Sequence, residues 1–149
     1  MATEDPQGRH PLSARQLPDH LSAVGPGWHP LLLRLHEQLL DLDAGYHVDD
    51  LKEKLGAARI RITGTTALTY TEGRALVSAT EEQSATVCEF CGAPGRRRRR
   101  GDTTEGWMKA VCDNCHRDWT RHTIMIINGS VRRSPNTAYR NLGADEGRP

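Results

Sequence analysis

The sequence predicts a small α+β fold, in which two helices pack on a short antiparallel sheet, with an appended four-cysteine zinc ribbon and disordered termini. Leucines recur at helical spacing between residues 31 and 42, polar and apolar residues alternate over 59–63, and two Cys-x-x-Cys pairs follow. We expect four segments: a flexible arm over 1–26, an α+β domain over 27–87, the zinc ribbon over 88–128 and a disordered tail over 129–149.

The composition limits the size of the hydrophobic core. The 149 residues include 15 Leu, 6 Val, 5 Ile and 1 Phe, which is roughly 18% of the chain, whereas a full core usually needs ~20%. The 20 basic and 19 acidic residues nearly cancel, so the high net charge of a disordered chain is missing. A large enzyme core is therefore excluded, and a small fold stabilised by a metal is favoured.

The first elements follow from the apolar periodicity. A short helix is expected near 17–24, and a longer one over 30–44, where Pro30 suits the first turn and Gly45 ends the helix. The segment 46–55 stays open between a helix and a strand that enters a turn at Gly56. The apolar face of the longer helix comprises Leu31, Leu32, Leu35, Leu39 and Leu42.

Two strands and a second helix are expected next. Alternation over 59–63 is typical of a half-buried strand with Ile60 and Ile62 inward, and Leu68 and Tyr70 predict another strand over 65–71. A helix over 72–85 then leads directly into the first cysteine. Its expected core face comprises Ala75, Leu76 and Ala79.

The chain after the last cysteine contains one further apolar run. Residues 119–128 predict a closing strand or the end of a helix, followed by an Asn128-Gly129 turn. No apolar run approaches the ~20 residues that span a bilayer. The polar segment 1–20 lacks the apolar stretch of a signal peptide. We therefore expect a cytoplasmic protein with reduced thiols and no membrane partner.

The four cysteines form the most specific pattern in the chain: Cys88, Cys91, Cys112 and Cys115. Two-residue spacing lets both thiolates of a pair face one ion, and two pairs 20 residues apart complete a tetrahedral four-sulfur site. Such a site suits one structural Zn²⁺ and leaves no coordination position for a substrate. Rubredoxin-like iron, disulfides or free thiols are the alternatives. His116 and His122 are alternative ligands, but we expect them at the surface beside the site.

Two tryptophans flank the second cysteine pair. Trp107 precedes it and Trp119 follows it, and large side chains around a small metal site exclude water. We therefore expect both in a satellite core. The alternative for Trp107 is a platform on which a nucleobase stacks.

Five consecutive arginines, Arg96, Arg97, Arg98, Arg99 and Arg100, lie between the two cysteine pairs. Guanidinium groups bind phosphate bidentately and release counterions, so the run predicts DNA or RNA binding, mainly through the backbone. The residues expected on the same basic face are Lys109, Arg117, Arg121, Arg132, Arg133 and Arg140. The alternatives are a solvated loop, or a protein-interaction or inhibitory adaptor whose basic loop meets an acidic protein.

The cysteine pairs resemble the zinc knuckles of HNH endonucleases. The matching segments are Cys-Glu-Phe-Cys-Gly over 88–92 and Cys-Asp-Asn-Cys-His over 112–116. The resemblance implies a catalytic Asp-His pair between the knuckles, but residues 92–111 contain no histidine, and Thr103 follows Asp102. Only His116 matches the last histidine of that family. A protein without catalytic residues is therefore expected, with a degenerate nuclease as the remaining enzymatic alternative.

A broader resemblance extends from Gly27 to about Trp119. The segments 27–32, 48–56, 59–62, 72–76 and the ribbon with Gly106-Trp107 look like a group of small uncharacterised bacterial and prophage zinc-ribbon proteins. The chain departs from that group at Leu55 and Ala57 and in its longer arginine run. No activity comes with this resemblance. We expect a regulatory protein that is encoded by a mobile element.

Overall fold

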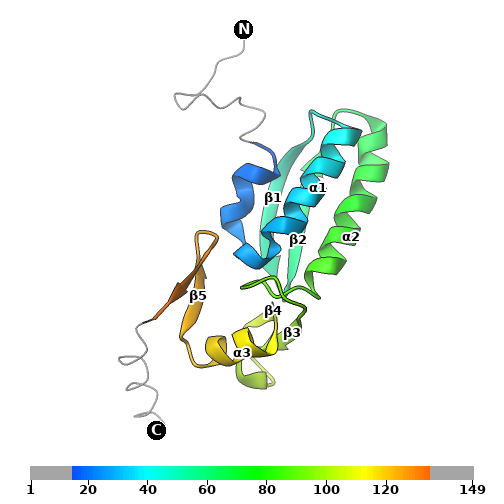
Figure 1. Ribbon diagram of the computed structural model, residues 1–149. Coiled ribbons are helices and arrows are strands. Elements are labelled where there is room, and N and C mark those ends of the chain that lie inside the picture. The colour runs from blue at the N-terminus through cyan, green and yellow to red at the C-terminus, as the bar shows by residue number, and fades with distance from the viewer. Residues whose placement is uncertain (1–14, 135–149) are drawn as a thin grey trace, which may run out of the picture.

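A computed structural model describes residues 15–134 of the chain, and these residues form two lobes (Figure 1). The first lobe packs helices α1 (His29–Leu42) and α2 (Arg74–Ser84) on the hairpin of β1 (His47–Lys54) and β2 (Ala57–Thr63). The second lobe contains the antiparallel hairpin of β3 (Arg96–Arg99) and β4 (Met108–Val111), helix α3 (Asp113–Thr120), and the hairpin of β5 (Ile124–Ile127) and β6 (Ser130–Arg133). The predicted α+β class is confirmed.

Each lobe has its own hydrophobic core. The first core consists of apolar residues from α1, β1, β2 and α2, together with Tyr46, with Ala110 of β4 and with three residues from the segment before α1, Leu17, Val24 and Trp28. The second consists of Cys88, Phe90, Val111, Cys115, Trp119 and Ile124. Two cysteines are therefore part of the packing in the second lobe, which contains few large apolar side chains. None of the described helices is both long and apolar enough to cross a bilayer.

The segment before α1 is docked on the molecule, which differs from the flexible arm expected over 1–26. Short 3₁₀ helices, η2 (Leu17–Ala23) and η3 (Pro26–Trp28), pack against α1, and Leu17 and Val24 are buried. A Cβ on Gly27 would lie 2.0 Å from the Cys88 carbonyl oxygen, so only glycine allows this approach. The isolated polar sequence hid this docking, because its partners are not neighbours in the sequence: Leu17 N–H donates to the Tyr46 hydroxyl, 29 residues away, and Gly25 N–H to Glu89, 64 residues away. Residues 1–14 of the expected arm lie outside the described part.

Helix α1 agrees with its prediction, and the open segment 46–55 is the strand β1. Asp49 forms a β-bulge: Val48 pairs with Ile62, but Asp50 pairs with Arg61. The extra residue turns Val48 and Leu51 to the same buried face at a three-residue spacing, which imitates a helical pattern. Leu55 lies in the turn with φ of 55° and is half-exposed.

The strand expected over 65–71 is wrong. This segment enters a π-helical turn, η4 (Thr69–Gly73), that continues into α2, and the Thr66 hydroxyl accepts a hydrogen bond from Thr69 N–H at 3.1 Å. Leu68 and Tyr70, whose alternation suggested the strand, are both exposed. Their spacing therefore does not report a buried face.

Helix α2 is present, but its predicted core face is partly wrong. Leu76 is half-buried against the core, whereas Ala75 and Ala79 are exposed. The buried positions of the helix proper are Val77, Thr80 and Ser84. The Ser84 hydroxyl accepts from Ala58 N–H and the Glu81 carboxylate accepts from Ile60 N–H, both at 2.8 Å. Polar α2 side chains thus accept hydrogen bonds from backbone N–H groups at the free edge of β2, and this protects the edge from pairing with another chain.

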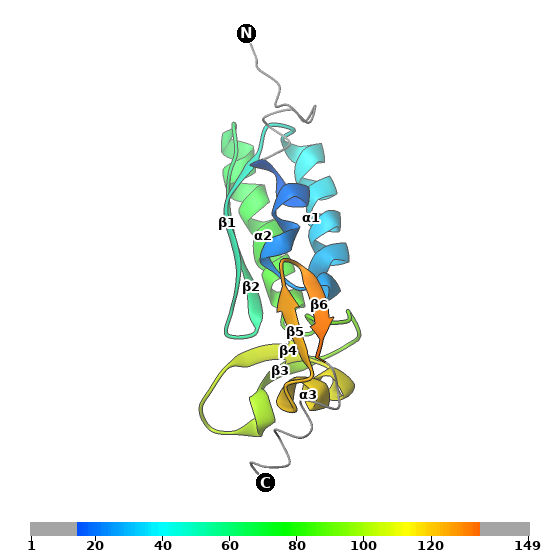
Figure 2. The same cartoon turned by 90° about the vertical axis from the view of Figure 1, so that its left-hand side faces the viewer.

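The C-terminal boundary also differs from the prediction. Strand β5 confirms the apolar run, and Asn128 and Gly129 form a tight turn with φ of 52° and 79°. The chain then returns as β6, so 130–133 belong to a hairpin and not to a disordered tail. The rest of the expected tail, 135–149, lies outside the described residues. The turn of this hairpin lies against η2, since a Cβ on Gly129 would lie 2.8 Å from the Ser22 Cα, and Figure 2 shows the hairpin above α3.

Asp43, which follows α1, fastens the loop that leads to η4. Its carboxylate accepts hydrogen bonds from the Thr69 hydroxyl at 2.6 Å, from Thr65 N–H at 2.6 Å and from Gly45 N–H at 2.9 Å. Chiefly the Thr69 hydroxyl, followed by Thr65 N–H, lowers the pKa of Asp43 from 3.8 to about 2. The folded state therefore stabilises the ionised form of Asp43 more than the unfolded state does.

We expect this carboxylate to make stability depend on pH. Its contribution is complete above pH 4 and is lost as the pH falls through about 2, because the unfolded state takes up the proton first. Thermal melting should show Asp43→Asn less stable than the natural chain at pH 6, with the difference shrinking between pH 4 and pH 2. Asp41→Asn, an exposed neighbour, is the matched control. An Asp43→Asn difference that does not change with pH would contradict this role.

Candidate metal centre and arginine surface

The first cysteine pair lies in a tight turn that follows α2. The turn is closed by the Cys88 N–H, which donates to the Ala93 carbonyl, and by the Gly92 N–H, which donates to the Cys88 carbonyl, both at 2.8 Å. Val87 and Pro94 form an antiparallel bridge across its base. These backbone bonds hold the two sulfurs on the same side of the turn.

The second pair lies where β4 ends and α3 begins. Cys112 is the N-cap of α3, and its sulfur accepts a hydrogen bond from Cys115 N–H at 3.4 Å. The Cys91 sulfur similarly accepts from Ala93 N–H at 3.5 Å. Each knuckle thus directs a backbone N–H at a sulfur, an arrangement that stabilises a thiolate.

The four sulfurs converge as a metal site requires. All four cysteines are free thiols, and their sulfur atoms lie within 4.8 Å of one another. The Cys91 and Cys112 sulfurs are 3.7 Å apart. A tetrahedral ion with metal–sulfur bonds of about 2.3 Å places its sulfurs about 3.8 Å apart. The donor set and its dimensions therefore fit one tetrahedral, thiolate-bound metal ion.

Burial of the site adds to the case for a cation. Desolvation is the main cause that raises the pKa of the Cys88 and Cys115 thiols. Cys112 is also desolvated, but hydrogen bonds from the Cys115 backbone and from neighbouring thiols outweigh this effect and lower its pKa. Four thiolates this close repel one another, and a divalent cation between them offsets that repulsion.

The shell around the cysteines contains only one of the two predicted tryptophans. Trp119 is buried and packs against Phe90, with ring centroids 6.4 Å apart. Trp107 is 73% exposed, so its predicted place in the satellite core is wrong. It lies in the loop before β4, outside the apolar cluster that surrounds the metal centre.

His116 lies beside the centre and is not part of the sulfur cluster, but it is buried and not at the surface as expected. Its Nε2 donates to the Arg99 carbonyl at 3.0 Å, and its ring packs edge-on against Trp119. The candidate metal group found among the described residues contains cysteines alone, so His122 is not part of it either.

The first four residues of the arginine run form strand β3 and Arg100 begins a 3₁₀ turn, η5 (Arg100–Asp102), so the run does not project as a loop. Arg98 is 14% exposed and makes a two-bond contact with Asp102, at 3.1 and 2.6 Å, and a further bond to Asp113 at 2.9 Å. Arg99 donates to the Gly106 carbonyl at 2.8 Å. The guanidinium of Arg100 stacks over Trp119 at 4.9 Å. Three of the five arginines thus stabilise the ribbon, while Arg96 and Arg97 stay exposed.

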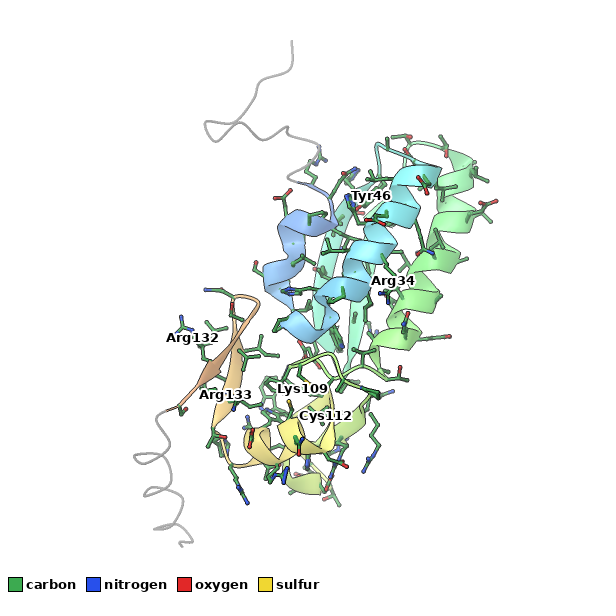
Figure 3. All side chains as sticks on the ribbon, in the orientation of Figure 1. Arg34, Tyr46, Lys109, Cys112, Arg132 and Arg133 are labelled. Atoms are coloured by element: carbon green, nitrogen blue, oxygen red, sulfur yellow. The ribbon has the colours of Figure 1, made fainter. Side chains whose placement is uncertain are left out.

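Lys109 is also placed differently from its prediction as a nucleic-acid contact. Its Nζ lies 2.9 Å from Glu89 and 3.7 Å from Glu53, and its side chain is 17% exposed. Glu89 is almost fully buried and also accepts from Gly25 N–H at 2.9 Å. These three side chains join the segment before α1, strand β1 and the ribbon. Figure 3 shows Lys109 at this junction of the two lobes.

Sequence reasoning missed Glu89, the residue between the first two ligand positions. A glutamate in a turn ordinarily faces solvent, and nothing local distinguishes this one. Its partners, Gly25 and Lys109, lie 64 and 20 residues away. Only the folded arrangement brings them together.

The remaining arginines lie over and around α3, and we name Arg96, Arg117, Arg121 and Arg133 the arginine surface. All four are exposed. Contacts connect them through α3: Arg96 lies 3.8 Å from Asp113, Arg117 bonds to Asn114, and Arg133 lies 3.4 Å from Asp118. Positions 117 and 121 lie one helical turn apart on the same face. Arg140 lies outside the described residues.

A groove of about 380 Å³ continues this surface to the metal centre. Cys91 and Cys115 line it on one side, and Arg132 and Arg133 line it from the β5–β6 hairpin. Figure 3 shows both arginines on that hairpin. An anion in this groove would lie beside the thiolate site and two guanidinium groups.

No protein-family model, curated protein or solved structure matches the chain.

Proposed function

We propose that this chain is a non-enzymatic, cytoplasmic zinc-ribbon protein that binds nucleic acid through the phosphate backbone. The observation that carries the proposal is the arginine surface, four exposed arginines connected through α3 on a lobe built around a metal site. Exposed guanidinium groups bind phosphates readily, and phosphate contacts carry no base specificity. The expected affinity therefore depends on charge more than on the base sequence of the nucleic acid.

Zinc is the ion that the donor set favours. Four thiolates in tetrahedral geometry suit Zn²⁺, and the donor set offers no open position for a substrate. A structural role follows, since the ion would hold together a lobe with a small core. His116, the residue that matches the last histidine of HNH nucleases, bonds to a backbone carbonyl, which supports a non-catalytic role.

The charge balance of the second lobe supports the same function. Residues 88–134 contain ten basic and five acidic side chains. Four of the five carboxylates contact cations of the same lobe: Glu89, Asp102, Asp113 and Asp118. Little negative charge is left to oppose a phosphate backbone at the arginine surface.

Replacing Arg96, Arg117 and Arg121 by serine should weaken binding and flatten its salt dependence. Each phosphate contact contributes about 0.9 to the slope of log K against log salt on duplex DNA, so the loss should approach three units. Fluorescence anisotropy with a labelled oligonucleotide between ~50 and ~200 mM salt measures both quantities. The matched control replaces Arg59, Arg61 and Arg74, which are exposed on the first lobe.

The control triple should leave the slope within one unit of the natural chain. Equal effects of the two triples would show that binding follows total charge and not this surface. No binding by the metal-loaded natural chain at ~50 mM salt would refute the proposed function.

A protein-interaction role is the second candidate. Leu33 and Leu40 are 39% and 36% exposed on α1, two helical turns apart, and offer an apolar surface on the first lobe. A protein complex that survives the triple replacement in the arginine surface would favour this role.

A further inference from the structure

We infer that Trp107 forms a second contact with the ligand, a platform on which one unpaired base of a single-stranded nucleic acid stacks. The inference rests on the proposed function and narrows it from nucleic acid in general to chains with unpaired bases. It starts from the most exposed large apolar side chain in the described part, whose indole is 73% accessible.

The backbone that carries Trp107 is held firmly. Its carbonyl accepts from Arg100 N–H at 3.0 Å, and the preceding Gly106 carbonyl accepts from the Arg99 side chain at 2.8 Å. The residue is followed directly by β4. An exposed aromatic ring on an anchored backbone loses little conformational freedom when a ligand stacks on it.

Two grooves meet at the indole. One, of about 420 Å³, lies between the lobes and is lined by Lys52, Phe90, Trp119 and Met125 among others. The second, of about 370 Å³, is lined by Lys54, Leu55 and Met108. Trp107 and Glu53 line both grooves, so the ring stands between two spaces, each comparable in volume with a small-ligand pocket.

The charge around the grooves fits a phosphate chain. Exposed Lys52 and Lys54 lie at the grooves, and exposed Arg97 contacts Met108 at 3.7 Å. Both groove carboxylates are bound within the protein: Glu53 accepts from Gly56 N–H at 2.8 Å and Glu89 pairs with Lys109. An aromatic ring flanked by cations is the pattern by which proteins hold single strands.

The geometry favours unpaired bases over a duplex. Bases inside a duplex are covered above and below by their neighbours, so an indole has no free face on which to stack. A base in a single strand or loop presents that face, and any of the four bases can use it. The arginine surface would bind either form, whereas the Trp107 platform would bind only the unpaired one.

The fluorescence of the chain allows a direct test with a ten-nucleotide oligothymidylate and a ten-base-pair duplex. Trp28 and Trp119 are buried, but Trp119 also lines the first groove, so the quenching that is lost in Trp107→Phe is the part that reports on Trp107. We expect the single strand to quench the emission, and Trp107→Ala to weaken its binding about tenfold or more while duplex affinity changes less than twofold. Trp107→Phe should retain most of the affinity.

Tyr70→Ala is the matched control. Tyr70 is 72% exposed but lies on η4, at the end of the first lobe far from the ribbon (Figure 1). Its replacement should leave both affinities unchanged. Thermal melting verifies that each variant is folded.

Three results would overturn the inference. If Trp107→Ala lowers single-strand affinity no more than Tyr70→Ala does, the platform does not exist, although the arginine surface can still bind. If analytical ultracentrifugation shows that the natural chain is a dimer, and Trp107→Ala makes it monomeric without changing single-strand affinity, the indole contacts a second copy of the chain and not a base. If neither oligonucleotide binds the natural chain, the proposed function fails together with the inference.

Discussion

Replacing Cys88 by serine is expected to abolish tight metal binding and to unfold the second lobe. Cys88 is fully buried within the apolar cluster of that lobe, so the cluster and the metal site lose one of the two cysteines that they share. Structural zinc contributes about 10–16 kcal/mol in small zinc-finger peptides, far more than a single core contact. Metal analysis should find one zinc per natural chain and much less than one per Cys88→Ser chain.

Hydrogen exchange locates the damage within the chain. Amides of β3, β4 and α3 should lose protection in Cys88→Ser, while those of α1, whose residues pack in the other core, should keep most of theirs. His116→Gln is the control, because His116 follows a ligand position but bonds to the Arg99 carbonyl. It should keep one zinc. A full equivalent of zinc in Cys88→Ser, or iron in the natural chain, would contradict the proposed site.

Replacing Lys109 by methionine is expected to cost about 3–5 kcal/mol of unfolding free energy. The substitution leaves the Glu89 carboxylate buried without its cation, and an uncompensated buried charge is strongly destabilising. Urea denaturation at pH 7 measures the loss. Lys52→Met is the control, since that lysine is exposed and its ion pair with Asp50 contributes little.

A second replacement tests the cause. Lys109→Met combined with Glu89→Gln removes both charges, so it should recover a large part of the stability lost in the single variant. The salt slope of nucleic-acid binding by folded Lys109→Met should match that of the natural chain, because Lys109 contacts carboxylates and not phosphate. A single-variant loss below about 1 kcal/mol would contradict the role of this ion pair.

The parts of the fold with local causes could be predicted from the sequence. Helix α1 has an unbroken apolar face, β2 alternates regularly, and the Asn128-Gly129 turn uses residues that tolerate positive φ. The convergence of the four cysteines followed from their spacing alone. In each case a few neighbouring residues determine the conformation.

Other segments were left open or predicted wrongly, because their structure depends on how they pair and pack with other parts of the chain. The bulge at Asp49 left 46–55 open between a helix and a strand, because it gives the buried residues Val48 and Leu51 a helical spacing. The prediction over 65–71 was wrong because Leu68 and Tyr70, which alternate as the inward positions of a strand would, are exposed. The segment before α1 is ordered by Glu89, whose carboxylate accepts from Gly25 N–H. The hydrophobic pattern of a short stretch of sequence does not reveal a contact with a residue so far along the chain.

The arginine run shows the same limit at the candidate site. When their partners are unknown, five adjacent like charges predict a loop that binds nucleic acid, with a solvated loop as the alternative. Two contacts make part of the run structural. Arg98 bonds to Asp113, which is 15 residues away, and the Arg100 guanidinium stacks over Trp119. The exposed charge lies instead on residues that are scattered in the sequence, Arg117, Arg121 and Arg133.

One titration tests the central claim, that a metal-built lobe presents the arginine surface to nucleic acid. Zinc is added to metal-free protein in the presence of a labelled oligonucleotide at ~50 mM salt, and anisotropy is followed as a function of metal. The account predicts that binding rises with added zinc and stops rising at one equivalent per chain. Binding that is already complete without metal, or absent at one equivalent, would contradict it.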